Sequence, residues 1–311
     1  MHMGMGVKKI LWLSRGLAIA VLLAVLPAVL PGLDGGSGRP AATADAAART
    51  TACGGVAAVS STDGVWRCRF SDDFTGTTLN RNKWIVQHTP VTGWRSGREC
   101  YLNHPENVRV SGGLLSLTAR EKAKLFLCET PGGGGYWTRV TSGMVTTWGR
   151  FQQTYGRWEI RARFPDVTTR GVHSALWLWP RVQNYGAWPR SGEIDIAEFF
   201  SGKPDRAIPY IHYRKARWDP SVTNTSCLID RTRFQTYRLD WTRSTLTVSI
   251  DGKVCVRHTI NPAWPLSKPA PFDKPFFLAL TQALGIGQNG YSSWTTQLPA
   301  TTQIDWVRVW G

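Results

Sequence analysis

Alternation of apolar and polar residues with a period of two constrains this chain more than any other feature. Between Gly156 and Phe164, apolar side chains at the even positions alternate with charged side chains at the odd positions. Residues 237–241 repeat the pattern, and the apolar positions of residues 246–256 lie on either side of the dipeptide Asp251-Gly252. The alternation predicts strands with one face on a core, and the dipeptide predicts a hairpin turn.

A final strand is predicted at residues 304–310, with the even-numbered residues on one face and the odd-numbered residues on the other. No long segment has the 3.6-residue period of an amphipathic helix. Many short strands separated by Gly and Pro turns predict an all-β sandwich or barrel.

The N-terminal segment has the composition of an export signal. Basic residues 8, 9 and 15 precede an apolar run from Leu17 to Leu33, and Ala44-Asp45-Ala46 offers a cleavage site between small residues. We expect residues 1–46 to be a secretory signal peptide, so that the protein is extracellular. An uncleaved membrane anchor is the alternative. Residues 47–62 are predicted to be a loose lead-in, and residues 63–311 a single catalytic domain.

Six cysteines lie beyond the predicted signal, and an even number in an exported chain indicates disulfides. No CxxC pair suggests a zinc site. Six cysteines allow 15 pairings, and we predict that sequence neighbours pair: Cys53–Cys68, Cys100–Cys128 and Cys227–Cys255.

The chain is strongly basic, with a formal charge of +16. Residues 1–46 hold four basic and two acidic residues, so +14 remains without them. Such a charge favours contact with an anionic cell wall or an acidic polysaccharide. The basic residues are scattered singly, and no nucleic-acid motif is present, so we expect no nucleic-acid partner.

Three acidic residues are concentrated in one predicted strand. Glu193 and Asp195 are two residues apart and share a strand face, whereas Ile194 and Ile196 face the core. Simple alternation would bury Glu198 among the isoleucines, where a lone carboxylate is costly. One extra residue near Ile196-Ala197 returns Glu198 to the acidic face, so we predict a β-bulge there.

With this bulge, Glu193 and Glu198 are separated by ~13 Å between Cα atoms, at ~3.3 Å per residue. Inward-leaning side chains then reach the ~5–5.5 Å carboxyl separation of a retaining glycosidase, and Asp195 between them can align the nucleophile. A solvated acidic strand or a calcium site is the alternative interpretation. Sixteen tryptophans agree with sugar binding, although most are expected in the core.

At this point the chain resembles glycoside hydrolase family 16, the laminarinase-like endo-β-glucanases, whose bulged signature Glu-x-Asp-x-x-Glu matches Glu193 to Glu198. Other segments resemble the family in order and spacing: residues 70–76 with Trp84, 107–110, 113–119, 155–163, 175–178, 188–192 and 304–310.

The resemblance implies a concanavalin-like β-jelly roll of two curved antiparallel sheets. It implies Glu193 as nucleophile, Asp195 as its helper and Glu198 as general acid/base. It implies a sugar-stacking role for Trp177 and a histidine, His212, near the acid/base. The substrate-binding residues expected with them are Trp188, His173, Glu99, Tyr101 and Gln282. No cofactor is expected for catalysis, and a structural calcium ion is implied at Asp72 and Asp305.

Two positions depart from the family pattern. His173 replaces a tryptophan found in many β-1,3-glucanases, and Met144 replaces an arginine. The expected function is retaining endo-hydrolysis of β-1,3- or mixed β-1,3/1,4-glucan by a monomer without stable membrane insertion. The alternatives are the same chemistry on a galactan or anionic chain and a lectin-like binding protein. An anionic substrate stays an alternative because arginines lie near the predicted site segments, at positions 95, 98, 170 and 190.

Overall fold

The computed structural model describes residues 52–215 and 221–311, and regular structure in these ranges is almost entirely antiparallel strand. The helical segments described are short: the 3₁₀ turns η1 (Ala52–Gly55) and η2 (Gly287–Asn289) and the single turn α2 (Thr89–Thr92). The predicted signal segment, residues 1–46, lies outside the described residues. Among those described, no helix is long and apolar enough to cross a membrane.

The first sheet holds the strands predicted from the clearest alternation. Its strands follow the spatial order β5, β6, β17, β8, β13, β14 and β15, and β2 pairs with the C-terminal part of β17. Their bounds are β2 (Gly64–Asp72), β5 (Val108–Ser111), β6 (Leu114–Thr130), β8 (Gly156–Arg163), β13 (Gln235–Trp241), β14 (Thr245–Ile250), β15 (Lys253–Thr259) and β17 (Ala300–Trp310).

The second sheet carries the acidic strand. Its order is β3, β7, β16, β9, β10, β11 and β12. The bounds are β3 (Ile85–Val86), β7 (Gly134–Thr146), β9 (Val172–Pro180), β10 (Glu193–Phe200), β11 (Ile208–His212), β12 (Ser221–Thr223) and β16 (Phe276–Leu284), with β4 (Cys100–Tyr101) parallel to β7.

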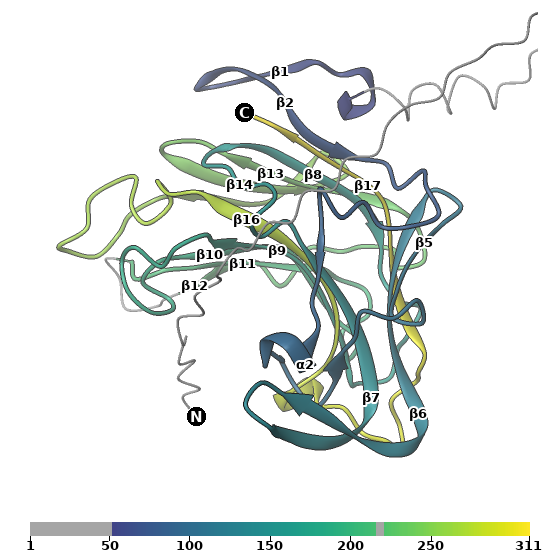
Figure 1. The fold of residues 1–311 in the computed structure, drawn as a ribbon. Helices are drawn as coiled ribbons and strands as arrows, with labels where there is room; N and C mark the ends of the chain where they lie inside the picture. Colours follow the sequence, from purple (N-terminus) through teal and green to yellow (C-terminus); the bar gives the residue numbers. More distant parts are fainter. Residues whose placement is uncertain (1–51, 216–220) are drawn as a thin grey trace, which may run out of the picture. The chain divides into compact units, whose positions relative to one another are not determined.

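The long β6–β7 hairpin joins the two sheets. The first part of β6 pairs with β17 in one sheet, and the last part of β7 pairs with β16 in the other. Figure 1 shows β6 and β7 curving together while β8 and β17 lie in one layer and β9 to β11 in the other. Apolar residues from both layers form one buried core that includes Trp158, Leu239 and Ile194. The prediction of an all-β jelly-roll sandwich is confirmed.

Two expectations about strands are corrected. Residues 58–61 are not loose, because they form β1 (Ala58–Ser61), which pairs with β2. In β17, the pairing with β8 shifts between Ile304 and Trp306, which indicates a bulge. Ile304 therefore faces the core together with Val307, whereas Trp306 is only half-buried, so the predicted single face for all even positions is wrong.

The three predicted disulfides, Cys53–Cys68, Cys100–Cys128 and Cys227–Cys255, are present. The hairpin at Asp251-Gly252 is also present, with φ angles of 47° and 80° at these two residues. Positive φ at both central positions is what a two-residue hairpin turn of this twist requires.

Candidate active site

The bulge predicted in β10 determines which side chains reach its outer face. Asp195 pairs with Trp177 of β9, but Ala197 pairs with the next residue, Leu176, so two residues of β10 correspond to one step of β9. Ile196 and Ala197 both enter the interlayer core. Glu198 returns to the outer face and is partly exposed, as Glu193 is. We call this outer face, with Glu193, Asp195 and Glu198, the carboxylate face.

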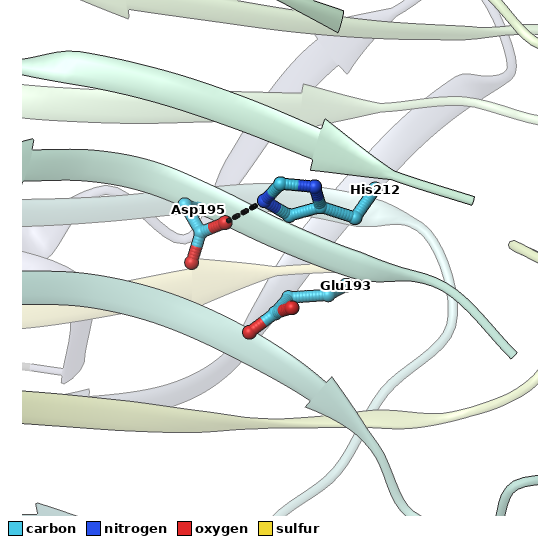
Figure 2. A group of neighbouring side chains, drawn as sticks. All are labelled: Glu193, Asp195 and His212. Atoms are coloured by element: carbon cyan, nitrogen blue, oxygen red, sulfur yellow. Dashed lines mark ion pairs between the residues drawn. The ribbon is translucent and has the colours of Figure 1, made fainter. Parts of the chain in front are cut away.

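His212 of β11 lies beside the first two carboxylates of this face. It pairs in register with Glu193, and its Nε2 atom is 3.4 Å from Oδ2 of Asp195. Figure 2 shows the three side chains on the same side of the sheet, with the ion pair dashed. One ligand-type atom from each lies within 4.8 Å of the others, a grouping that could also hold a metal ion. His212, which the family resemblance placed near Glu198, contacts Asp195.

Burial and nearby negative charge favour the protonated forms of Glu193 and Asp195. Burial, then the charges of Asp195 and Glu198, raise the pKa of Glu193 well above its ordinary value, and the hydrogen bond from Trp188 opposes the rise. Burial and Glu198 raise the pKa of Asp195 to about 6, although His212 lowers it. Carboxylates this close share protons and titrate as a group.

Trp188 comes from the loop between β9 and β10 and covers Glu193. Its Nε1 atom donates a hydrogen bond to Oε2 of Glu193 at 2.5 Å, and its ring centroid lies 5.6 Å from that of His212. The side chain is 50% exposed, so one face remains open. An indole N–H can only donate, so this contact stabilises the ionised form of Glu193.

A second histidine contacts Glu198. The Nε2 atom of His173, on β9, is 2.8 Å from Oε1 of Glu198, and the imidazole stacks on Phe200 with centroids 4.8 Å apart. Burial lowers the pKa of His173, but the hydrogen bond and charge of Glu198 outweigh it, with smaller contributions from Asp195 and Glu99, so the pKa is raised. His173 was predicted only as a substrate-binding residue.

Aromatic rings line the carboxylate face along β9. Trp177 is half-buried, and its Nε1 donates to Oγ1 of Thr281 at 2.9 Å. Trp179 packs edge-on against Trp177, with centroids 5.8 Å apart. The sequence reasoning missed Trp179, although it lies two residues from Trp177 and period two places both rings on the same face.

Glu99 and Tyr101 are fully buried rather than open to a sugar. Oε1 of Glu99 accepts hydrogen bonds from Ser96 at 2.6 Å and from Tyr101 at 3.0 Å. The ring of Trp94 lies against Tyr101, with centroids 5.3 Å apart. Met144 is buried in the same cluster. The expectation of direct sugar contacts from Glu99 and Tyr101 is therefore not supported by their burial, and they form a layer beneath the surface.

Gln282 lies inside the sandwich, which corrects its predicted position at the substrate. Its side chain is fully buried, and its amide oxygen accepts hydrogen bonds from Ser174 at 2.9 Å and Thr302 at 2.8 Å. Its amide nitrogen donates to the carbonyl groups of His173 and Ala283. Thr302 belongs to β17, so Gln282 connects the two sheets and has no free group for a sugar.

The two predicted calcium ligands already have protein partners. Asp72 accepts hydrogen bonds from the backbone N–H of Phe74 and from Nε1 of Trp84, and Asp305 forms an ion pair with Arg161 at 3.2 Å. Calcium prefers six to eight oxygen ligands. These contacts leave calcium binding at Asp72 and Asp305 a prediction.

The fold is a jelly-roll sandwich, and the outer face of one sheet carries three carboxylates flanked by aromatic rings. This combination defines a glycoside hydrolase of the all-β class. The chain belongs to the glycosyl hydrolases family 16, whose family model matches residues 98–308.

Individual relatives agree with this membership. The chain is 30% identical over 261 residues to glucan endo-1,3-beta-glucosidase A1 of Niallia circulans, over 78% of this chain but only 37% of that protein. It is 32% identical to the beta-glucanase of Rhodothermus marinus, over 79% of this chain and 85% of the relative. The X-ray structure of the laminarinase from Rhodothermus marinus superposes with a TM-score of 0.66 at 31% identity, covering 79% of this chain and 97% of the laminarinase.

Proposed function

We propose that this protein is a secreted, retaining endo-β-glucanase that cleaves β-1,3- or mixed β-1,3/1,4-linked glucan. The bulge in β10 is the observation that carries the proposal, because it places Glu193, Asp195 and Glu198 on one face. The relatives named as glucanases support the choice of polymer.

In the first step, a carboxylate oxygen of Glu193 attacks the anomeric carbon and the glycosidic C–O bond breaks. Glu198 gives its proton to the departing oxygen, leaving a glycosyl ester on Glu193. In the second step, Glu198 takes a proton from water, the water oxygen attacks the same carbon, and Glu193 leaves as a carboxylate. The products are two shorter chains, and net retention follows from two displacements.

Glu193 must be ionised to attack, yet its surroundings raise its pKa. The N–H donor of Trp188 favours the ionised form. Asp195 lies beside Glu193 and shares its proton, so a proton that moves onto Asp195 leaves Glu193 ionised and lets Asp195 donate a hydrogen bond to it. Trp177 and Trp179 supply apolar faces on which pyranose rings can stack.

A reducing-sugar assay tests the polymer. Laminarin and a mixed-linkage glucan should be cleaved, and early products should be long oligosaccharides because the cut is internal. No cleavage of any β-1,3- or mixed-linkage glucan would overturn the proposed substrate.

Cleavage of an acidic polysaccharide or a galactan is the second candidate. Its support is the net charge and the exposed arginines at positions 95, 98, 170 and 190. Cleavage that weakens steeply with added salt would indicate an anionic substrate, because screening acts over ~8–10 Å at physiological ionic strength. Binding without cleavage of any polymer would instead support the lectin-like alternative.

Export is supported by the N-terminal charge and hydropathy pattern together with three disulfides. N-terminal sequencing of protein recovered from culture medium should give a start at or near residue 47. Full-length chain retained in the membrane fraction would support the anchor.

A further inference from the structure

Among the described residues, His173 is the side chain that hydrogen-bonds to Glu198. The atoms joined are Nε2 of His173 and Oε1 of Glu198, at 2.8 Å, and the two side chains are about four-fifths covered. The contact is built by strand register, because Glu198 pairs with Ala175 and Phe200 pairs with His173 itself. The imidazole therefore meets the acid/base diagonally across β9 and β10.

Further contacts hold the imidazole ring and the backbone of His173. Phe200 stacks on it with an angle of 11° between the ring planes, and the backbone carbonyl of His173 accepts a hydrogen bond from Gln282. The charged groups that raise the pKa of His173 are Glu198 and Asp195 on β10, and Glu99 from the segment before β4. Negative surroundings favour the imidazolium, which can donate from Nε2 to Glu198.

We propose that His173 is a positioning residue for the acid/base, holding Oε1 of Glu198 so that Oε2 is the oxygen that exchanges a proton with the leaving group. The inference rests on the proposed function, because it assigns a partner to the acid/base of that reaction. The imidazolium also stabilises the carboxylate that Glu198 becomes once its proton has passed to the glycosidic oxygen, so the contact strengthens as the bond breaks.

Leaving-group dependence separates this role from substrate binding and from folding. A glucan leaves as a poor alkoxide and needs the proton of Glu198, whereas a dinitrophenolate leaves without one. In His173→Phe, which keeps a ring against Phe200, we expect kcat/KM on laminarin to fall about 10- to 100-fold, a part of the ~10²–10⁴-fold that general acid catalysis contributes. On a 2,4-dinitrophenyl β-laminaribioside it should change less than about threefold, since general acid catalysis contributes little there.

Two further variants refine the test. His173→Gln can keep an N–H donor near Glu198 but has no titrating ring, so it should recover part of the laminarin activity lost in His173→Phe. Phe200→Leu removes the stacking partner and keeps the imidazole, so it should cost less than His173→Phe. Melting temperatures of all three variants, compared with wild type, check that each is folded.

The pH profile supplies a second readout. The pKa of His173 is raised, so the imidazolium is retained until the pH passes this raised value and is then lost. The wild-type rate on laminarin should fall over that range on the alkaline side, and His173→Gln should lack this component. The profile on the dinitrophenyl glycoside should differ little between the two proteins.

Equal losses on both substrates, or unchanged activity and pH profile in His173→Phe, would overturn the role of His173. Glu198→Ala distinguishes a failure of the proposal about His173 from a failure of the proposed function. If that variant still cleaves laminarin at the wild-type rate, the proposed function itself is wrong, whereas if it does not, only the assignment of His173 is at stake.

Discussion

At the level of single residues, the assignment depends on two glutamates that the structure surrounds differently. Glu193 accepts a hydrogen bond from Trp188, whereas Glu198 contacts His173. In the proposed reaction, the donor to Glu193 favours the ionised nucleophile, and the imidazolium beside Glu198 stabilises the carboxylate that forms once Glu198 has given its proton away.

Glu193→Gln should abolish turnover, because the amide has nearly the same volume but cannot attack the anomeric carbon. We expect a loss of at least about 10⁴-fold in kcat on laminarin, as for the removal of a covalent nucleophile. Sugar binding should persist in a laminarin pull-down, and the melting temperature should not fall. Residual activity above a few per cent of wild type contradicts the assignment.

Glu198→Ala should slow the hydrolysis of laminarin and respond to an added nucleophile. Azide needs no general base, so it can attack the glycosyl ester on Glu193 when an activated glycoside has formed it. The expected product is a β-glycosyl azide, identified by the anomeric coupling constant in proton NMR. An α-azide would show a single displacement and would contradict retention.

At the level of strands, the bulge in β10 sets the face on which each side chain lies, and the buried amide of Gln282 connects neighbouring strands. The bulge directs Glu198 outward and places Ala197 in the core. Gln282 lies on the core side of β16, where it satisfies polar groups of β9 and β17.

Gln282→Leu should therefore affect stability and not substrate affinity. The hydroxyl groups of Ser174 and Thr302 keep the hydrogen bond to each other, but the carbonyl groups of His173 and Ala283 would lose the amide donor of Gln282. We expect a loss of about 2–6 kcal/mol in the free energy of unfolding, at ~1–3 kcal/mol for each of these two carbonyl groups. Denaturant titration measures it, and exposed Gln152→Leu is the matched control. An increase in KM for laminarin with no loss of stability would instead return Gln282 to the substrate site.

At the level of the whole molecule, the carboxylate face lowers the free energy of unfolding by an amount that depends on pH. The pKa of Asp195 is raised from 3.8 to about 6 by burial and by Glu198. The native state therefore binds more protons than the unfolded state between these values, so stability falls as the pH rises through this window.

Asp195→Asn should remove this cost. We expect the variant to be more stable than wild type at pH 8, by up to about 3 kcal/mol for a shift of ~2 units, and to show little gain at pH 3.5. Thermal unfolding at both pH values measures the difference. Exposed Glu129→Gln, which also removes one negative charge, is the control and should show no such dependence. An equal change at both pH values would contradict the raised pKa.

The sequence by itself determined the class of fold and the face on which each acid of β10 lies, and the disulfide pairs predicted from sequence proximity are present. Strand alternation is a local property, so the faces of β8, β13 and β14 follow from neighbouring residues, whereas the pairing of β14 with β15 shifts after Val248 and leaves Val254 exposed. The bulge in β10 was predictable because a buried, unpaired Glu198 would have been too costly. The bulge in β17 was missed because Asp305, the buried charge at the bulge, is balanced by an ion pair with Arg161 of β8, which residues 304–310 alone do not reveal.

Only the tertiary structure decided which partners meet across strands. His212 contacts Asp195, His173 contacts Glu198, and Gln282 joins the sheets through register between strands distant in the sequence. The burial of Glu99 and Tyr101 beneath Trp94 depends on how a loop packs onto β7. Residue type and spacing give the direction of a side chain along its own strand, but its neighbours depend on pairing distances set by the whole sandwich.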